Sequence, residues 1–251
     1  LAQSSDPAAF DESAAVRRRL DEGQPSATAQ GTAMQRAAHQ VFDDPRVLDD
    51  PIALRIIGPE NEAALQSNPE WYQTPRSLGV RAFVVMRSRY AEDALAEATQ
   101  RGVRQYVVLG AGLDTFAYRN PYAGQVHVLE VDHPSTQAWK RNRLRAAGIE
   151  IPASLTFAPV NFEKQTLADA LERAGFRRSE PAVFSWLGVV VYLTRAAVMQ
   201  TLQFVAASTA PGSEIVFDLL VPSAALSEPQ QRSREASIRR VAALGEPWLS
   251  F

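Results

Sequence analysis

The stretch Val103–Asp132, VRQYVVLGAGLDTFAYRNPYAGQVHVLEVD, joins two short apolar runs through a turn that contains glycine. The first run, Tyr106–Leu109, leads directly into the turn Gly110–Asp114, and the second run, Val126–Val131, is closed by Asp132. Short runs rich in Val and Leu and bounded by Gly are typical of buried β-strands. Glycine lets the backbone turn tightly and lets a ligand approach it. The stretch therefore predicts two strands with a ligand-binding turn between them.

Three further strand-like runs follow downstream, and helical patterns separate most of them. Alternating strands and helices predict βαβ units, and hence a mostly parallel sheet with helices on both faces. The fold class is therefore α/β. The further strands are expected at 155–160, 182–187 and 214–219, and the helices at 75–101, 134–147, 165–174, 195–207 and 228–244.

The chain divides into three parts. Residues 1–27 are rich in Ala, Ser, Gln and Asp and are expected to form a flexible N-terminal arm. Residues 28–75 contain short helical patterns and Pro-containing turns, which predict a helical cap over a larger core. Residues 76–251 are expected to form the ligand-binding α/β domain.

Composition excludes several classes of site. The 251 residues contain no Cys, which excludes disulfides, thiolate–zinc sites and iron–sulfur clusters. His39, His127 and His133 lack metal-ligand spacing, so no metal site is expected; His133 is expected to cap the next helix and His39 to pack. A net charge of −2 argues against a nucleic-acid partner, and no apolar run approaches the roughly 20 residues that cross a membrane. We therefore expect a cytoplasmic protein; its oligomeric state is left open.

An acidic strand end follows the glycine turn, with Glu130 and Asp132 about 20 residues after Gly112. A carboxylate at this position accepts hydrogen bonds from ribose hydroxyls, which predicts a nucleoside cofactor. A dinucleotide site needs a third Gly where this chain has Thr115, and Asp114 would repel a pyrophosphate. S-adenosylmethionine, which carries a sulfonium and an ammonium group, is therefore favoured over NAD.

These residues resemble the leucine carboxyl methyltransferase-like branch of the class I S-adenosylmethionine-dependent methyltransferases. Besides the stretch 103–132, the similar segments are Met86–Tyr90 (MRSRY), Trp186–Leu193 (WLGVVVYL) and Pro211–Asp218 (PGSEIVFD). The resemblance runs from about residue 28 to the C-terminus and implies a Rossmann-like class I methyltransferase fold with an N-terminal helical cap. That fold usually ends in an antiparallel strand pair, which residues 245–251 do not supply, so we expect a shortened C-terminus.

The resemblance also implies roles for single residues. Arg87 would pair with the carboxylate of the cofactor, and Asp132, with Glu130 close by, would bind the ribose. Leu187 stands where the family commonly has Glu, and Trp186 could compensate by stacking on the cofactor. Asn161 stands where the family usually has Asp beside the adenine. The implied cofactor-binding set is Arg87, Gly110, Ala111, Gly112, Asp114, Glu130, Asp132, Asn161, Phe162 and Trp186.

Methyl transfer from a sulfonium is an in-line displacement, and a carboxylate acceptor is already ionised near pH 7, so it needs no general base. We therefore expect O-methylation of a carboxyl group on a small molecule or of an exposed carboxylate, with S-adenosylhomocysteine as product. Tyr192 and Arg119 are the acceptor-side candidates; the alternatives are packing for Tyr192 and a salt bridge to the cap for Arg119. Leu187 and Asn161 leave open a cofactor-binding protein without activity, and an NAD-dependent oxidoreductase is a third alternative.

Overall fold

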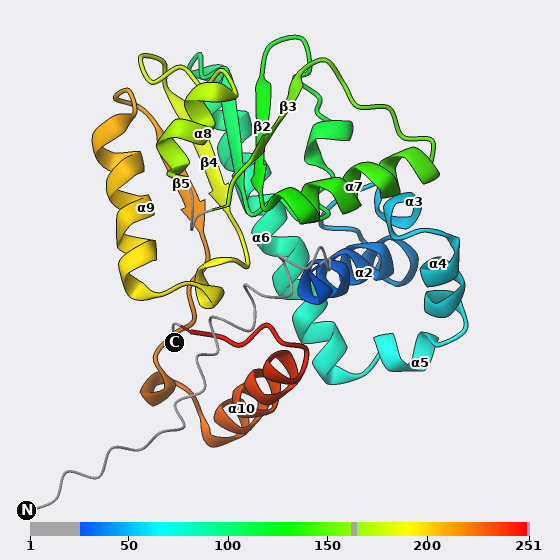
Figure 1. Ribbon diagram of the computed structural model, residues 1–251. Coiled ribbons are helices and arrows are strands. Elements are labelled where there is room, and N and C mark those ends of the chain that lie inside the picture. Colours follow the sequence, from blue (N-terminus) through cyan, green and yellow to red (C-terminus); the bar gives the residue numbers. More distant parts are fainter. Residues whose placement is uncertain (1–25, 162–164, 250–251) are drawn as a thin grey trace, which may run out of the picture.

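The computed structural model describes residues 26–161 and 165–249, and its centre is a sheet of five parallel strands (Figure 1). The strand order is β3-β2-β1-β4-β5. The α/β fold class and the five expected strands are confirmed, with small differences at the strand ends. The strands are β1 (Gln105–Leu109), β2 (His127–Asp132), β3 (Leu155–Pro159), β4 (Ala182–Trp186) and β5 (Glu214–Phe217).

The expected helices are confirmed as well. Several of them begin at a side chain that accepts a hydrogen bond from the first-turn backbone, such as Ser26, Thr74 and Thr194. His133 caps α7 in this way, as expected. The helices are α2 (Ala27–Phe42), α3 (Ala53–Ile57), α4 (Pro59–Gln66), α5 (Pro69–Tyr72), α6 (Pro75–Gln100), α7 (Pro134–Ala146), α8 (Leu167–Arg173), α9 (Arg195–Ser208) and α10 (Glu228–Ala243).

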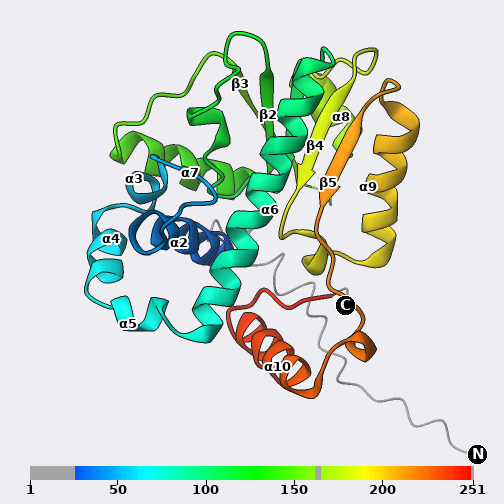
Figure 2. The same ribbon diagram turned by 180° about the vertical axis from the view of Figure 1, so that it is seen from behind.

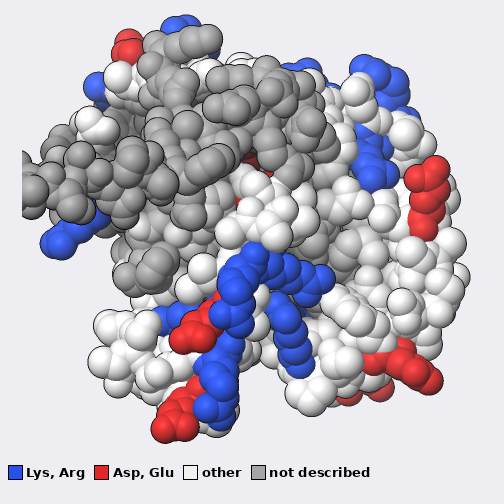
Figure 3. Space-filling model, turned by 60° about the horizontal axis from the view of Figure 1, so that its bottom comes forward, with Lys and Arg blue, Asp and Glu red and all other residues white. Residues whose placement is uncertain are grey.

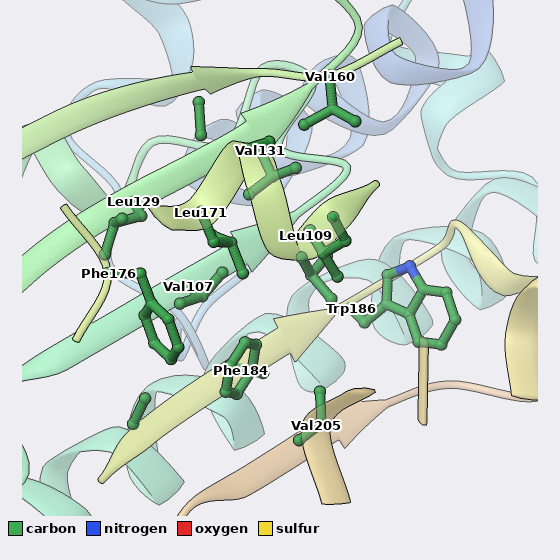
Figure 4. Close-up of a cluster of buried hydrophobic side chains, with 14 of the residues drawn as sticks. Val107, Leu109, Leu129, Val131, Val160, Leu171, Phe176, Phe184, Trp186 and Val205 are labelled. Carbon is green, nitrogen blue, oxygen red and sulfur yellow. The ribbon is translucent and has the colours of Figure 1, made fainter. Parts of the chain in front are cut away.

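Helices cover both faces of the sheet. On one face, α8 and α9 pack on Val107, Leu129 and Phe184, which form the buried cluster in Figure 4. On the other face, α6 packs on Tyr106 and Val128. Successive side chains of a strand point to opposite faces, so a sheet buried on both sides needs apolar residues at consecutive positions. The uninterrupted apolar runs of the sequence meet this requirement.

Helices α2–α5, here called the cap, form a third apolar cluster beside the sheet (Figure 1). The cluster joins Ala37 and Ile56 of the cap to Leu113, in the turn after β1, and to Leu144 of α7. His39 is buried in the cap, where its Nε2 accepts backbone hydrogen bonds from the turn after α2, so its packing role is confirmed. The cap therefore contacts the turn that leaves β1.

Helix α6 connects the cap to the sheet. Thr74 caps its first turn, Pro75 occupies the first helical position, and Gly102, with a φ of +96°, follows its end. Figure 2 shows this helix running from the cap along one face of the sheet. Arg87, near its middle, lies against the segments that follow β4 and β5.

The connection from β1 to β2 contains the short 3₁₀ helix η1 (Phe116–Tyr118) and no α-helix. Strand β1 pairs with β2 on one side and with β4 on the other, so the chain order reverses there. In parallel sheets, ligands bind beyond the carboxyl ends of the strands at such a reversal. The turn Gly110–Asp114 leaves β1 at this point.

The helices within 26–161 and 165–249 lack the combination of length and hydrophobicity that crossing a membrane requires. On α10, Arg232 pairs with Glu228 and Arg239 with Glu235, and Figure 3 shows basic and acidic side chains next to one another on this side of the molecule. Residues 1–25 of the expected arm lie outside the described residues. After β5 the described part of the chain adds α10 and no further strand.

Candidate cofactor-binding site

The turn after β1 fits tightly between the cap and the segment that follows β4. Gly110 and Gly112 have φ angles of +68° and +47°, which side chains disfavour. A Cβ on Gly110 would lie 2.3 Å from Val189 Cγ2, and one on Gly112 would lie 3.1 Å from Ala29 Cβ at the start of the cap. Backbone conformation therefore favours glycine at both positions, and packing excludes a side chain at Gly110 and leaves little room for one at Gly112.

Asp132, at the end of β2, is bonded to this turn. Its Oδ2 accepts a hydrogen bond from Gly112 N at 2.6 Å, and its Oδ1 accepts one from His133 N at 2.6 Å. Burial raises the pKa of Asp132, and these two bonds oppose that effect. Because each carboxylate oxygen has two lone pairs, both oxygens can still accept a hydroxyl group. Asp132 is thus a fixed acceptor beside the turn, as a ribose would require.

The same turn is unsuited to a diphosphate. Dinucleotide sites place the pyrophosphate at the N-terminus of the helix that follows the glycine turn, and this connection has no such helix. The N–H of Gly112, which would face a phosphate, donates to the carboxylate of Asp132. Asp114, whose Oδ1 accepts a hydrogen bond from Phe116 N, adds a second carboxylate to the turn. These groups fit a cofactor that carries a hydroxylated sugar and positive charge.

Arg87 and Asp218 form an ion pair at the carboxyl ends of β4 and β5. Arg87 Nη1 donates to Asp218 Oδ2 at 2.7 Å, and Asp218 Oδ1 accepts a hydrogen bond from Gly188 N at 2.6 Å. The guanidinium lies against Gly188, where a Cβ would be 2.6 Å from Nη2. Asp218 was not singled out from the sequence. Its position directly after β5, comparable to that of Asp132 at the end of β2, is the signal that could have identified it.

Replacing Gly188 by Ala is expected to displace the Arg87 guanidinium and to weaken binding of S-adenosylhomocysteine, measured by calorimetry. The φ of +71° adds a strain of about 1–2 kcal/mol. Gly148→Ala is the matched control, because Gly148 has a φ of +62° and open space where its Cβ would lie. Both variants should lose similar stability, and only Gly188→Ala should lose affinity. Equal affinities would contradict the placement of Arg87 in the site.

Tyr192 ends the 3₁₀ helix η2 (Val190–Tyr192) and lies near the first turn of α2, where Thr28 is within hydrogen-bonding reach of its hydroxyl. Burial raises the pKa of Tyr192, so the hydroxyl stays protonated at neutral pH. The same first turn is held by Glu246, whose carboxylate accepts hydrogen bonds from Ala27 N at 2.7 Å and Thr28 N at 3.0 Å. Glu246 lies far away in sequence and was also not anticipated.

Glu130 does not reach the ribose side of the turn. Its side chain is 1% exposed, and its Oε2 lies 2.6 Å from Nζ of Lys140, on α7, which is equally buried. The expected ribose contact of Glu130 is therefore replaced by an ion pair inside the protein. The reason is that α7 covers this part of β2, whereas Asp132 lies at the strand end.

Two further residues of the expected site make contacts inside the protein. Trp186 is 3% exposed and lies in the buried cluster of Figure 4, with its ring 6.4 Å from that of Phe217, so it is a core residue. Arg119 Nη1 donates to Glu92 at 2.9 Å and its Nε lies 3.4 Å from Asp50, so the alternative of a salt bridge to the cap is confirmed.

The remaining expected residues are placed as follows. The backbone of Ala111 donates to Val131 O at 3.1 Å and holds the turn against β2. Asn161 is partly exposed after β3, and its carbonyl accepts a hydrogen bond from Gln165 N. Phe162 lies outside the described residues.

Comparison with known proteins identifies the family. The family model described as leucine carboxyl methyltransferase matches residues 29–206. The relative named "Putative S-adenosyl-L-methionine-dependent methyltransferase YktD" from Bacillus subtilis (strain 168) is 33% identical over 249 residues, covering 90% of this chain and 81% of the relative. A protein of Mycolicibacterium paratuberculosis (strain ATCC BAA-968 / K-10), also named as a putative S-adenosyl-L-methionine-dependent methyltransferase, is 31% identical over 224 residues, covering 83% of this chain and 69% of that protein.

A relative from Parafrankia sp. (strain EAN1pec) is 33% identical over 193 residues, covering 76% of this chain and 62% of its own length. Among solved structures, one titled as a putative methyltransferase from Thermobifida fusca YX superposes with a TM-score of 0.54 at 18% identity, covering 92% of this chain and 78% of that one, which shows a shared fold. The chain belongs to the leucine carboxyl methyltransferase family of S-adenosylmethionine-dependent methyltransferases.

Proposed function

We propose that this methyltransferase binds S-adenosylmethionine at the turn after β1 and O-methylates a carboxyl group on a small molecule or an exposed carboxylate. The observation that carries the proposal is the arrangement of charge around the turn. Asp132 lies on the β2 side, and the pair of Arg87 and Asp218 lies on the side of β4 and β5. A nucleoside joined to an amino acid needs such groups at its two ends.

In this proposal, the cofactor supplies an activated methyl group, and the protein's residues bind and orient. Asp132 would accept hydrogen bonds from the ribose hydroxyls, and Arg87 would bind the carboxylate of the methionine end. The bare backbone at Gly110 and Gly112 lets the turn fit between Val189 and Ala29, which holds it in place beside the cofactor. Fixing donor and acceptor in line removes much of the entropic part of the barrier.

The acceptor side favours a carboxylate over a hydroxyl. A tyrosine hydroxyl is protonated at neutral pH, and burial raises the pKa of Tyr192 further, so this hydroxyl is a hydrogen-bond donor and not a base. A donor suits an ionised carboxylate, which needs orientation and no deprotonation. A hydroxyl acceptor would need a base at this point. We therefore propose Tyr192 as an orienting residue for the acceptor carboxylate.

The test is formation of S-adenosylhomocysteine when the protein and S-adenosylmethionine are offered carboxylic acids and, separately, the matching primary alcohols. Turnover with acids alone is the expected result. Turnover with alcohols alone would overturn the carboxylate assignment. S-adenosylmethionine should raise the temperature of thermal unfolding, because at a hundredfold excess over Kd it adds about 2.7 kcal/mol to the free energy of unfolding. NAD should leave the unfolding temperature unchanged.

Replacing Arg87 by Ala is expected to weaken S-adenosylhomocysteine binding by roughly ten- to a hundredfold, because a charge-assisted hydrogen bond contributes about 1.5–3 kcal/mol. Arg89→Ala is the matched control, since Arg89 lies on the same helix, is about half exposed and pairs with Asp93. Its affinity should equal that of the wild type. Calorimetric titration measures both, and an unchanged Kd for Arg87→Ala would contradict the assignment.

A further inference from the structure

The ion pair of Arg87 and Asp218 keeps part of its surface accessible. The two side chains are 13% and 16% exposed, whereas the pair of Glu130 and Lys140 is closed at 1% each. A carboxylate offers about four lone-pair positions. Asp218 uses one for Arg87 and one for the N–H of Gly188. It can therefore accept further hydrogen bonds from a ligand.

The pair has the charges that an amino-acid group requires. In the methionine end of the cofactor, the ammonium and the carboxylate are attached to the same carbon atom. Where charged side chains bind both groups, they must therefore be opposite in sign and close to each other. Arg87 and Asp218 meet this condition, with 2.7 Å between Nη1 and Oδ2, beside a glycine whose missing side chain leaves room for the guanidinium.

The end of β4 offers no carboxylate of its own, because Leu187 is apolar. Other acids that the site contains are bonded at other places: Glu246 at the start of α2, and Asp132 at Gly112 and His133 on the β2 side of the turn. Asp218 is the acid that is bonded to the backbone directly after Leu187, at Gly188 N. The carboxylate next to Gly188 thus comes from β5.

We propose that Asp218 accepts hydrogen bonds from the ammonium group of the cofactor's methionine end, in place of a strand-four carboxylate that Leu187 does not provide. This assignment rests on the proposed cofactor site. In the competing role, Asp218 does not contact the cofactor and only orients Arg87 for the cofactor's carboxylate. The two roles differ for a ligand that has the ammonium and lacks the carboxylate.

The experiment titrates wild type and Asp218→Asn by calorimetry with three thioethers. S-adenosylhomocysteine carries both charged groups, decarboxylated S-adenosylhomocysteine carries only the ammonium, and 5′-methylthioadenosine carries neither. The matched control is Glu214→Gln, which removes a carboxylate at the other end of β5, where Glu214 pairs with Arg101.

Asp218→Asn is expected to weaken binding of the two ammonium-bearing ligands by roughly ten- to a hundredfold and to leave binding of 5′-methylthioadenosine unchanged. Unchanged binding of 5′-methylthioadenosine would also show that the site is folded in the variant. Glu214→Gln should bind all three like the wild type. If Asp218→Asn bound S-adenosylhomocysteine more weakly but bound the decarboxylated ligand as tightly as the wild type, the ammonium contact would be overturned. Asp218 would then only orient Arg87. An equal loss of affinity for all three ligands would also overturn the ammonium contact. A wild type that binds none of them would overturn the proposed cofactor site itself.

Discussion

Replacing Lys140 by Met is expected to lower the free energy of unfolding by about 3–5 kcal/mol at pH 8, because it leaves the buried carboxylate of Glu130 without its partner. Both side chains are 1% exposed, and Lys140 Nζ lies 2.6 Å from Glu130 Oε2. The methionine fills a similar volume, so the loss measures the unpaired charge and not a cavity. Urea unfolding at fixed pH gives the value.

The loss should depend on pH. Burial raises the pKa of Glu130 to about 7, although Lys140 opposes this shift, and without the lysine the pKa rises further. A carboxyl group whose pKa is higher in the folded than in the unfolded chain stabilises the fold at pH values below its pKa in the unfolded chain. That stabilisation is lost as the pH rises through its pKa in the folded chain. The variant should therefore be close to wild type at pH 5 and increasingly less stable toward pH 8.

Two further variants make the test specific. Arg145→Met changes an exposed basic residue on the same helix and should alter stability by no more than about 0.5 kcal/mol. Adding Glu130→Leu to Lys140→Met removes both charges and should recover most of the lost stability. A loss that is the same at both pH values, or that the second substitution does not relieve, would show that Glu130 is not the cause.

The strands and the position of Asp132 could be predicted because they depend on local pattern, whereas Arg87 was expected only from the family resemblance and Asp218 was not anticipated. Val107 and Val108 face opposite layers and are both buried, which an uninterrupted apolar run indicates. Asp132 could be placed because it follows the second strand, and parallel strands end at the same edge of the sheet. By the same rule Trp186, inside the apolar run of β4, belongs in the core, where the structure places it.

The partners of the charged residues could not be predicted, because pairing is decided by packing between distant segments. Arg87 and Asp218 are 131 positions apart, and Ala27 and Glu246 are 219 positions apart. Glu130 and Asp132 face the same side of β2, and only the position of α7 decides that one is buried and the other lies at the turn. No periodicity in a single sequence encodes that difference.

Replacing Asp50 by Ala is expected to lower the free energy of unfolding by about 3–5 kcal/mol, because its carboxylate sits among buried cations. Asp50 is 1% exposed, and its Oδ2 accepts a hydrogen bond from Thr115 Oγ1 at 2.5 Å. Its oxygens also lie 3.5 Å from Arg36 Nε and 3.4 Å from Arg119 Nε. Arg119 retains Glu92 in the variant, so the largest cost falls on Arg36.

The neighbouring Asp49 provides the control for this variant. Asp49 is 81% exposed and lies 3.8 Å from Arg46, a surface contact that contributes little to stability. Asp49→Ala should therefore unfold at the same denaturant concentration as the wild type. Asp50→Asn keeps an acceptor for Thr115 while it removes the charge, and should lie between Asp50→Ala and the wild type.

The same substitution tests whether the cap positions the cofactor turn. Asp50 binds Thr115, Arg36 donates to the carbonyl of Leu113, and Ala29 lies against Gly112, so the cap contacts the turn at three points. Loss of one of them should let the turn move and weaken S-adenosylhomocysteine binding under conditions where the variant remains folded. Asp50→Asn, which preserves the hydrogen bond to Thr115, should retain more affinity than Asp50→Ala even after the difference in folded fraction is taken into account. If Asp50→Ala lost stability and yet bound the ligand as tightly as the wild type, the turn would keep its shape through the sheet alone, and the cap would have no part in forming the site.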